Sequence, residues 1–285
     1  MNYLLLTKPR SIALLLMTAL GGMVVAGGEI PSPALLTLTM LGGALAAGGA
    51  NCLNCYLDRH LDRQMARTKD RPLPAGRLQP RQALLFGLGL CGAAIPVLAV
   101  GVNVLSAILA AAGILYYVVI YTRWLKRTSP WSVVFGGGAG VLPLLVGWTA
   151  VSGQLSLAAL WLGTVVFLWT PPHFWSLALL RHRDYALVDL PMLPTVLGRG
   201  ETCRQITIYA SLLMALTLVA VPAGVAGAPF LVAALLLGTL LLHHSIVLLA
   251  EASNEAAQGL YRYSMVYLAL LFGALILDRV VWRWA

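Results

Sequence analysis

The sequence predicts an all-α polytopic membrane protein, a bundle of nine transmembrane helices with its N-terminus on the cytoplasmic side. Of its 285 residues, 60% are hydrophobic and only 10% are charged, against about 25% charged in an ordinary soluble domain. This composition excludes a soluble globule and an intrinsically disordered chain. Four cysteines in a chain of this length also exclude a disulfide-stabilised scaffold.

Nine apolar runs give the number of helices. A helix rises about 1.5 Å per residue and must cross a hydrocarbon core of about 30 Å, so a span needs about 20 apolar residues. We expect spans at residues 11–28, 34–57, 83–101, 103–122, 131–150, 155–180, 205–226, 228–249 and 262–282. The first run is longer than the core of a usual signal peptide and no clear cleavage site follows it, so we interpret it as a retained helix.

The basic residues predict the orientation, because loops rich in Lys and Arg stay in the cytoplasm. With the N-terminus inside, 17 of the 19 basic residues fall in cytoplasmic segments, and only Arg279 and Arg283 fall outside. The reversed topology would invert this bias. The net charge of +9 is therefore explained as a topology signal, and we expect no nucleic acid partner.

The acidic residues point to the cytoplasmic side, where six of the ten lie in two long loops. Asn54, Asp58 and Asp62 are spaced at i, i+4 and i+8, so they share one face if the helix at 34–57 continues. Oxygen ligands favour a hard ion such as Mg²⁺, which binds one or two carboxylates together with substrate phosphates. The alternative interpretation is that both aspartates are solvated anions. Their partners would then be Arg59, Arg63 or Arg67.

Nearby cations favour a diphosphate site over solvated anions. The acidic stripe lies in the most basic segment of the chain, a second acidic cluster follows the span at 155–180, and residues 71–74 form a tight Arg-Pro-Leu-Pro turn. In such a site a metal ion neutralises the bridging oxygens of the diphosphate, and arginines and lysines neutralise the outer ones.

These segments resemble the UbiA-type intramembrane prenyltransferases. The stripe from Asn54 to Asp62, followed by RTKDRPLP at residues 67–74, is similar to the first aspartate-rich motif of that family. Residues 6–10 (LTKPR), 121–140 (YTRWLKRTSP, then GGGAG) and 170–198 (beginning TPPHFW and containing PMLP) are similar to its protohaem IX farnesyltransferase branch. Quinone-pathway relatives carry a D-x-x-x-D motif in place of the last segment. Cys55 and His60 depart from the pattern, where Asn and Asp are expected.

The resemblance covers most of the chain and implies one intramembrane domain over residues 1–285. The absence of an Arg/Ser-rich leader favours a bacterial cytoplasmic membrane over an organellar one. The resemblance also implies farnesyl diphosphate and haem b as substrates and Mg²⁺ as cofactor, with the haem O product passing to a haem A synthase or a terminal oxidase. The implied metal ligands are Asn54, Asp58, Asp62 and Asp184, and the implied catalytic residues are Asp58, Asp62, Asp184 and Tyr121. The implied diphosphate ligands are Arg67, Arg71 and Lys126.

His173 lies deep in the expected span at 155–180. An ionisable residue inside a membrane is a functional hypothesis by default. On one continuous helix it would lie three turns, about 16 Å, from Asp184. We interpret His173 as a haem contact, preferably an iron ligand. The alternative is that it only satisfies carbonyls freed by the kink at Pro171 and Pro172.

Two other features have simpler interpretations. The glycines at 136–140 lie inside a span, so we expect them to allow close helix approach. Asp278, with Arg279 and Arg283, is interpreted as a charge cluster on the outer face.

Two other functions stay open. One is the same fold acting on a quinone precursor such as 4-hydroxybenzoate, against which the TPPHFW and PMLP segments argue. The other is a transporter that uses Asp58 and Asp62 as a cation relay. A transporter predicts acids near the midplane and an inverted repeat, whereas the acids here lie at one rim and no internal repeat occurs.

Overall fold

A computed structural model describes residues 1–281, and all regular secondary structure in that range is helical. Arg283, one of the two basic residues expected on the outer side, lies outside the described residues. The helices are α1 (Asn2–Thr7), α2 (Pro9–Gly27), α3 (Pro33–Gln64), α4 (Pro80–Gly101), α5 (Val104–Leu115), the π-helical segment η1 (Tyr116–Leu125), α6 (Lys126–Thr128), α7 (Ser132–Ser152), α8 (Leu157–Leu180), α9 (His182–Ala186), α10 (Leu193–Val196), α11 (Gly198–Leu218), α12 (Ala228–Glu251) and α13 (Asn254–Val281).

Within residues 1–281, eight helical stretches are long and apolar enough to cross a membrane. The protein is therefore an integral membrane protein, and the predicted all-α fold class is confirmed. α11 occupies the place of the seventh expected span, but its first turns carry Arg199, Glu201 and Arg204, which lower its mean hydropathy. The ninth crossing and the cytoplasmic N-terminus stay predictions.

Helix boundaries differ from the expected ones where the chain leaves the apolar region. α3 continues to Gln64, seven residues beyond the predicted end, because its polar turns still bond along the helix. α11 ends at Leu218 rather than 226, before Pro222 and Gly224. Gly224 has a φ of 67°, in the left-handed region that favours glycine. The continuous helix from His173 to Asp184 is wrong, because α8 ends at Leu180 and α9 starts after a break.

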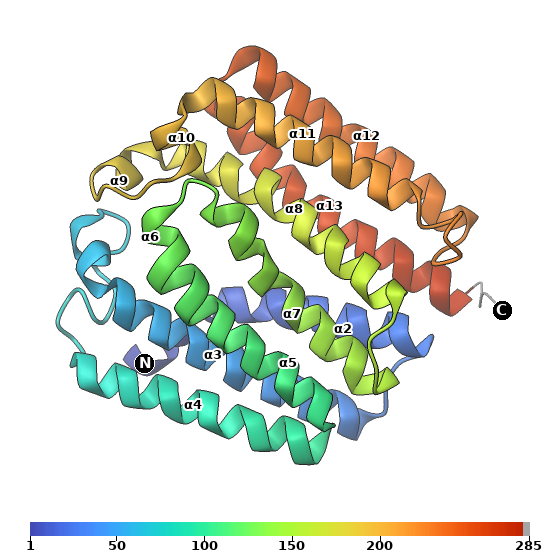
Figure 1. Cartoon of the computed structure of the whole chain (residues 1–285), viewed down its shortest axis with the longest axis horizontal. Coiled ribbons are helices and arrows are strands. Elements are labelled where there is room, and N and C mark those ends of the chain that lie inside the picture. Colours follow the sequence, from blue (N-terminus) through green and yellow to red (C-terminus); the bar gives the residue numbers. More distant parts are fainter. Residues whose placement is uncertain (282–285) are drawn as a thin grey trace.

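α7 and α8 occupy the middle of the bundle, with α3 and α4 along one side and α11 and α12 along the other (Figure 1). Helix α2 packs on α7 at very short range: a Cβ placed on Gly147 would collide with the backbone carbonyl of Ala19. Large side chains such as Trp175 and Tyr267 are fully buried between α8, α11 and α13. Small residues therefore allow close approach at one interface, and aromatic side chains fill the other.

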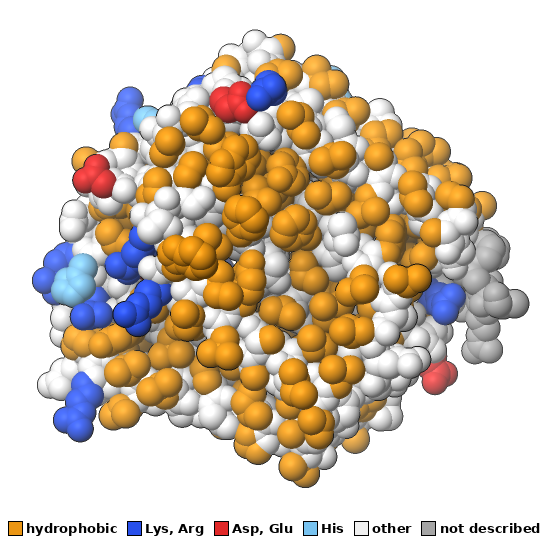
Figure 2. Space-filling view, in the orientation of Figure 1, with side chains coloured by type: hydrophobic (Ala, Val, Ile, Leu, Met, Phe, Trp, Pro, Cys, Tyr) orange, Lys and Arg blue, Asp and Glu red, His pale blue; other side chains and the backbone are white. Residues whose placement is uncertain are grey.

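Charged side chains concentrate at one end of the helices. Figure 2 shows an extensive hydrophobic surface, with most of the visible Lys and Arg side chains at the end where α6, α9, α10 and the loop after α3 meet. This is the surface expected of a protein whose sides face lipid and whose ends face water.

Asp278 is buried, and the charge cluster expected for it with Arg279 and Arg283 stays a prediction, because Arg283 lies outside the described residues. The two carboxylate oxygens of Asp278 accept hydrogen bonds from the backbone N–H groups of Gly227 and Phe230 at 2.8 and 3.2 Å. It therefore caps the start of α12 from the neighbouring helix α13. A carboxylate at a helix N-terminus satisfies free N–H groups and complements the helix dipole.

Candidate active site

Asp58 and Asp62 lie one turn apart on α3 and are both buried, with 3% and 5% of their surfaces exposed. The helix continues past them without a break, so the i, i+4 spacing places both carboxylates on one face. Two buried negative charges this close require positive partners, because an unpaired charge in a low-dielectric interior is very costly.

Each carboxylate is paired with a basic side chain from a later segment of the chain. Lys126 Nζ donates to Asp58 Oδ2 at 2.6 Å, and Arg127 Nη2 lies 3.4 Å from Asp58 Oδ1. Arg71 Nη1 donates to Asp62 Oδ2 at 2.8 Å. The interpretation of these aspartates as solvated anions paired with the arginines at 59, 63 or 67 is therefore wrong.

A further cation approaches from the N-terminus. Lys8 Nζ donates to Asn54 Oδ1 at 2.6 Å, and Asn54 Nδ2 donates to Asp58 Oδ2 at 3.0 Å. Lys8 has a φ of 55°, in the left-handed region that costs a non-glycine residue roughly 1–2 kcal/mol. Helix α1 is held on α3 because Asn51 Nδ2 donates to the Thr7 carbonyl at 2.8 Å. The fold thus holds this lysine over the stripe in a strained turn.

The π-helical segment η1 presents more side chains to α3. Thr122 Oγ1 accepts from Asn54 Nδ2 at 3.0 Å and donates to the Tyr117 carbonyl, five residues back, at 2.8 Å. The rings of Tyr117 and Tyr121 stack with 5.7 Å between centroids. A Cβ on Gly136 would lie 2.5 Å from the Tyr121 ring, so this glycine lets α7 approach η1 as expected. π-Helical segments are rare and occur frequently at functional sites.

Three residues of this network were missed by sequence reasoning: Lys8, Thr122 and Arg127. All three lie in segments that carry the family resemblance, LTKPR and YTRWLKRTSP. That resemblance was the available signal, because periodicity along one helix cannot show which distant segments meet.

Within residues 1–281, neither Arg67 nor Asp184, both predicted site residues, makes an ion pair with Asp58 or Asp62. Burial raises the pKa of the Tyr185 hydroxyl, Arg67 and Arg181 lower it, and Asp184 raises it. Asp184 and Tyr185 lie in α9, at the end of the bundle where the loop after α3 also lies. The structure does not bring Asp184 together with Asp58 and Asp62.

The buried stripe suits a hard divalent cation that also binds a phosphate ligand. In the described part of the chain, no group of three Asp, Glu, His or Cys side chains is placed to hold a metal ion. The stripe offers two carboxylates and the amide oxygen of Asn54. Mg²⁺ typically binds proteins in this way, through one or two carboxylates together with water and substrate phosphates. The donor set therefore fits a metal shared with a diphosphate.

His173 lies in a separate aromatic cluster between α8 and α13. Its ring stacks on Trp169 at 4.4 Å and on Tyr261 at 4.9 Å between centroids. Its Nδ1 is 2.8 Å from Ser264 Oγ, so it bonds a hydroxyl and not a carbonyl freed by the prolines. Because that hydroxyl donates to the Tyr261 carbonyl at 2.7 Å, it accepts from His173. The proton is then on Nδ1, and Nε2 carries the lone pair.

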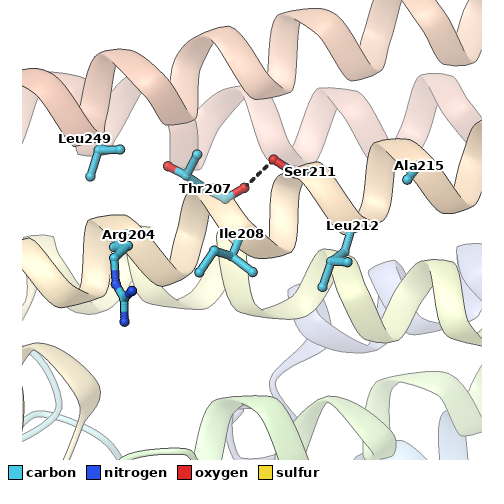
Figure 3. Close-up of a pocket in the computed structure, with 7 residues that line it drawn as sticks. All are labelled: Arg204, Thr207, Ile208, Ser211, Leu212, Ala215 and Leu249. Carbon is cyan, nitrogen blue, oxygen red and sulfur yellow. Dashed lines mark hydrogen bonds between the residues drawn. The ribbon is translucent and has the colours of Figure 1, made fainter.

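A pocket of about 460 Å³ lies elsewhere, along the outer side of α11 (Figure 3). Six of the seven lining residues shown are on α11 and the seventh, Leu249, is on α12. The lining is mainly apolar, and Arg204 at its end pairs with Glu201. No predicted site residue lines this pocket, so it is distinct from the candidate site.

The UbiA prenyltransferase family model matches residues 15–278. The chain belongs to the UbiA prenyltransferase family. It is 49% identical to a protoheme IX farnesyltransferase of Roseiflexus sp. (strain RS-1), over 98% of this chain and 52% of that protein. It is also 49% identical to one of Synechococcus sp. (strain JA-3-3Ab), over 98% of this chain and 84% of that protein. The chain thus spans about half the length of the first relative and most of the second.

Solved structures show the same UbiA fold. A digeranylgeranylglyceryl phosphate synthase matches with a TM-score of 0.83 at 17% identity, over 98% of both chains. A UbiA homologue from Archaeoglobus fulgidus, bound to GPP and Mg²⁺, matches with a TM-score of 0.66 at 16% identity, over 96% of this chain and 99% of that one. At these identities the likeness concerns the fold, and the site must be argued from the residues of this UbiA-family chain.

Proposed function

We propose that this protein transfers the farnesyl group of farnesyl diphosphate to a vinyl group of haem b, with addition of water, to give haem O and diphosphate. The observation that carries the choice of acceptor is the 49% identity over 98% of the chain to a relative named protoheme IX farnesyltransferase. The prenyl-transfer chemistry is supported by the family and by the paired carboxylates beneath four basic side chains.

The basic side chains stabilise the leaving group in this proposal. As the allylic C–O bond breaks, its electron pair goes to the diphosphate. Lys126 and Arg71 bind the two carboxylates and Lys8 binds Asn54, so all three cations lie at the site before substrate binds. Once they have turned to the bound diphosphate, their charges lie where negative charge develops, and the chemical step itself then needs little reorganisation. Asn54, Asp58 and Asp62 would hold Mg²⁺, which supplies further neutralisation of the diphosphate oxygens.

The rest of the reaction requires exclusion of water until carbon–carbon bond formation. The π electrons of the haem vinyl group form a bond to the first farnesyl carbon, and the cation left beside the porphyrin captures water and releases a proton. Early water would instead convert the farnesyl cation to farnesol. The stacked rings of Tyr117 and Tyr121 provide an apolar wall next to the basic side chains, and the loop at residues 71–76 would close the interior. Asp184 joins the metal site only if α9 moves inward when substrate binds.

His173 is the proposed haem contact. Its proton is held on Nδ1 by Ser264, which leaves Nε2 free to ligate iron, and a hydrogen bond on the other ring nitrogen orients a ligating imidazole. We expect His173→Ala to weaken haem b binding at least about tenfold while farnesyl diphosphate binding stays unchanged. Haem titration by visible absorption and farnesyl diphosphate binding by calorimetry would measure both. Equal haem affinities would reduce His173 to a packing residue.

The experiment that tests the function uses the purified protein in detergent with haem b, farnesyl diphosphate and Mg²⁺, followed by mass spectrometry of the extracted haem. We expect a haem heavier by one farnesyl group plus water, and none when EDTA is present. If EDTA left product formation unchanged, the proposed role of Mg²⁺ would be wrong, but the proposed prenyl transfer to haem would stand.

The same assay with 4-hydroxybenzoate tests the other acceptor. Prenylation of 4-hydroxybenzoate with unchanged haem would keep the UbiA chemistry and overturn the acceptor. No consumption of either acceptor, with intact farnesyl diphosphate, would favour the transporter hypothesis.

A haem O product is the form that a haem A synthase or a terminal oxidase would use next.

The site is proposed to face the cytoplasm across a bacterial inner membrane. The basic residues of the described chain gather at the end that carries the site, as the positive-inside bias predicts. A cysteine introduced at exposed Lys69 should resist a membrane-impermeant maleimide in intact spheroplasts and react after lysis. Labelling in intact spheroplasts would reverse the orientation.

A further inference from the structure

A second pocket, of about 260 Å³, lies at the same end of α3 as the candidate site. We call it the rim pocket. Its walls include Arg59, His60 and Arg63 of α3, Leu73 and Leu78 of the following loop, and Pro80 at the start of α4. Arg59 and Arg63 follow Asp58 and Asp62 by one residue each, so they lie about 100° around the helix from the acidic stripe. The rim pocket shares no residue with the stripe.

The rim pocket carries positive charge without a carboxylate in its lining. The ion pairs found among residues 1–281 involve neither Arg59 nor Arg63. Arg59 is held in place: its guanidinium lies 4.5 Å from the Tyr56 ring centroid, and its Nη1 donates to the Tyr56 carbonyl at 2.7 Å. A guanidinium has five N–H donors, so most of those on Arg59 stay available. Planar arginine donors match the geometry of a phosphate group.

The position of the rim pocket along α3 places it at the level of lipid headgroups. α3 has 32 residues, which at about 1.5 Å each give roughly 48 Å, more than the hydrocarbon core of about 30 Å. The last turns, with Arg59 and Arg63, therefore extend into the layer where phospholipid phosphates lie. Leu73, Leu78 and Pro80 add an apolar wall beside the cations. The volume is smaller than the roughly 300–1,000 Å³ of sites for drug-sized ligands and suits a single headgroup.

We propose that the rim pocket binds a phosphate group, carried by an anionic membrane lipid or present as a free ion. Arg59 and Arg63 supply the charge-assisted hydrogen bonds, and His60 lines the wall between them. The site is independent of prenyl transfer, because the acidic pair uses a different face of α3 and different cations.

The test measures lipid retention by the full-length protein. Protein from mixed phosphatidylcholine and phosphatidylglycerol nanodiscs is titrated with phosphatidylglycerol and observed by native mass spectrometry. We expect Arg59→Gln/Arg63→Gln to weaken phosphatidylglycerol binding about tenfold or more, because each lost cation contributes to attraction of an anionic lipid. The matched control Arg10→Gln/Lys69→Gln removes two exposed cations from the same end and should change the affinity by less than about twofold.

A competition with inorganic phosphate distinguishes the two sources. Displacement of phosphatidylglycerol by phosphate would show that the pocket recognises the phosphate itself, and failure of displacement would show that the lipid must carry it. Either outcome supports the proposal, and equal phosphatidylglycerol affinities of parent and Arg59→Gln/Arg63→Gln overturn it. Arg63→Gln alone guards against misfolding, because Arg63 is exposed and its side chain makes no ion pair or hydrogen bond within residues 1–281. Asp58→Asn should retain the lipid, so a failed prenyl-transfer assay leaves this result intact.

Discussion

The two ends of the bundle each bury aspartates, but they pair them with different kinds of group. Asp58 and Asp62 accept from lysine and arginine side chains and from an amide. Asp278, at the other end and only 1% exposed, accepts from the backbone N–H groups of Gly227 and Phe230. Burial of a carboxylate therefore does not by itself identify a functional site.

The hydrogen-bond partners distinguish the two ends, because side-chain partners can be exchanged for a ligand more easily than backbone N–H groups can. Lysine and arginine side chains can swing from a carboxylate to an incoming phosphate at the cost of a rotamer change. Backbone N–H groups at the start of α12 cannot move without unwinding the helix. The first arrangement suits a site that exchanges partners during a reaction, and the second suits a fixed structural cap.

The largest expected effect comes from Asp58→Asn. The asparagine keeps the shape and can still accept from Lys126, but Lys126 and Arg127 lose their ion pairs, so the thermal midpoint should fall and the rate is compared per folded molecule. Loss of the negative charge removes a metal ligand, and we expect haem O formation to fall by at least about a hundredfold, in the range found for removing one electrostatic contribution to a transition state. Single-turnover assays with equal amounts of folded protein measure the rate. Retention of more than half the parent rate would remove Asp58 from the metal site.

Much of the fold was predictable, because every long apolar run in the described chain must be a helix in lipid. The acidic stripe was also predictable, since i, i+4 and i+8 positions share a face on any continuing helix. The contact of Lys8 with Asn54 was not, because the two are 46 residues apart and meet only through the packing of α1 on α3. The capping role of Asp278 depends on a helix 51 residues away and was missed for the same reason.

Lys8→Asn removes the ammonium group at this position but keeps the left-handed backbone turn. Asparagine tolerates the left-handed backbone conformation but lacks the amine that donates to Asn54. We expect kcat/KM for farnesyl diphosphate to fall roughly 10- to 100-fold, the equivalent of one charge-assisted hydrogen bond of about 1.5–3 kcal/mol. Thermal stability should be unchanged. Parent-like kcat/KM would show that Lys8 serves only to position α1, and Lys8→Gly provides a second turn-compatible control.

Asp278→Asn is the isosteric counterpart of Asp58→Asn at the other end. The two N–H groups donate to different carboxylate oxygens at 2.8 and 3.2 Å, so the carboxamide oxygen replaces only one acceptor and the NH₂ group faces the other N–H. We expect the free energy of unfolding to fall by about 1–3 kcal/mol, visible as a lower thermal midpoint in detergent. The rate per folded molecule should match the parent. A lower rate at full folding would mean that the two ends are coupled and would break the comparison.

Gly136→Ala tests how precisely Tyr121 must be positioned at the end of the bundle that carries Asp58 and Asp62. A Cβ at this residue would lie 2.5 Å from the Tyr121 ring, so either the ring moves or α7 and η1 separate slightly. Asp58 and its cations stay in place, because none of them contacts this glycine. We expect a loss of about fivefold in haem O formation, equivalent to roughly 1 kcal/mol. Gly140→Ala, where a Cβ meets nothing within 4 Å, is the matched control and should keep the parent rate. Equal rates for both variants would show that the Tyr121 ring can shift without loss of activity. Precise placement would then be required only of Asp58, Asp62 and their basic partners.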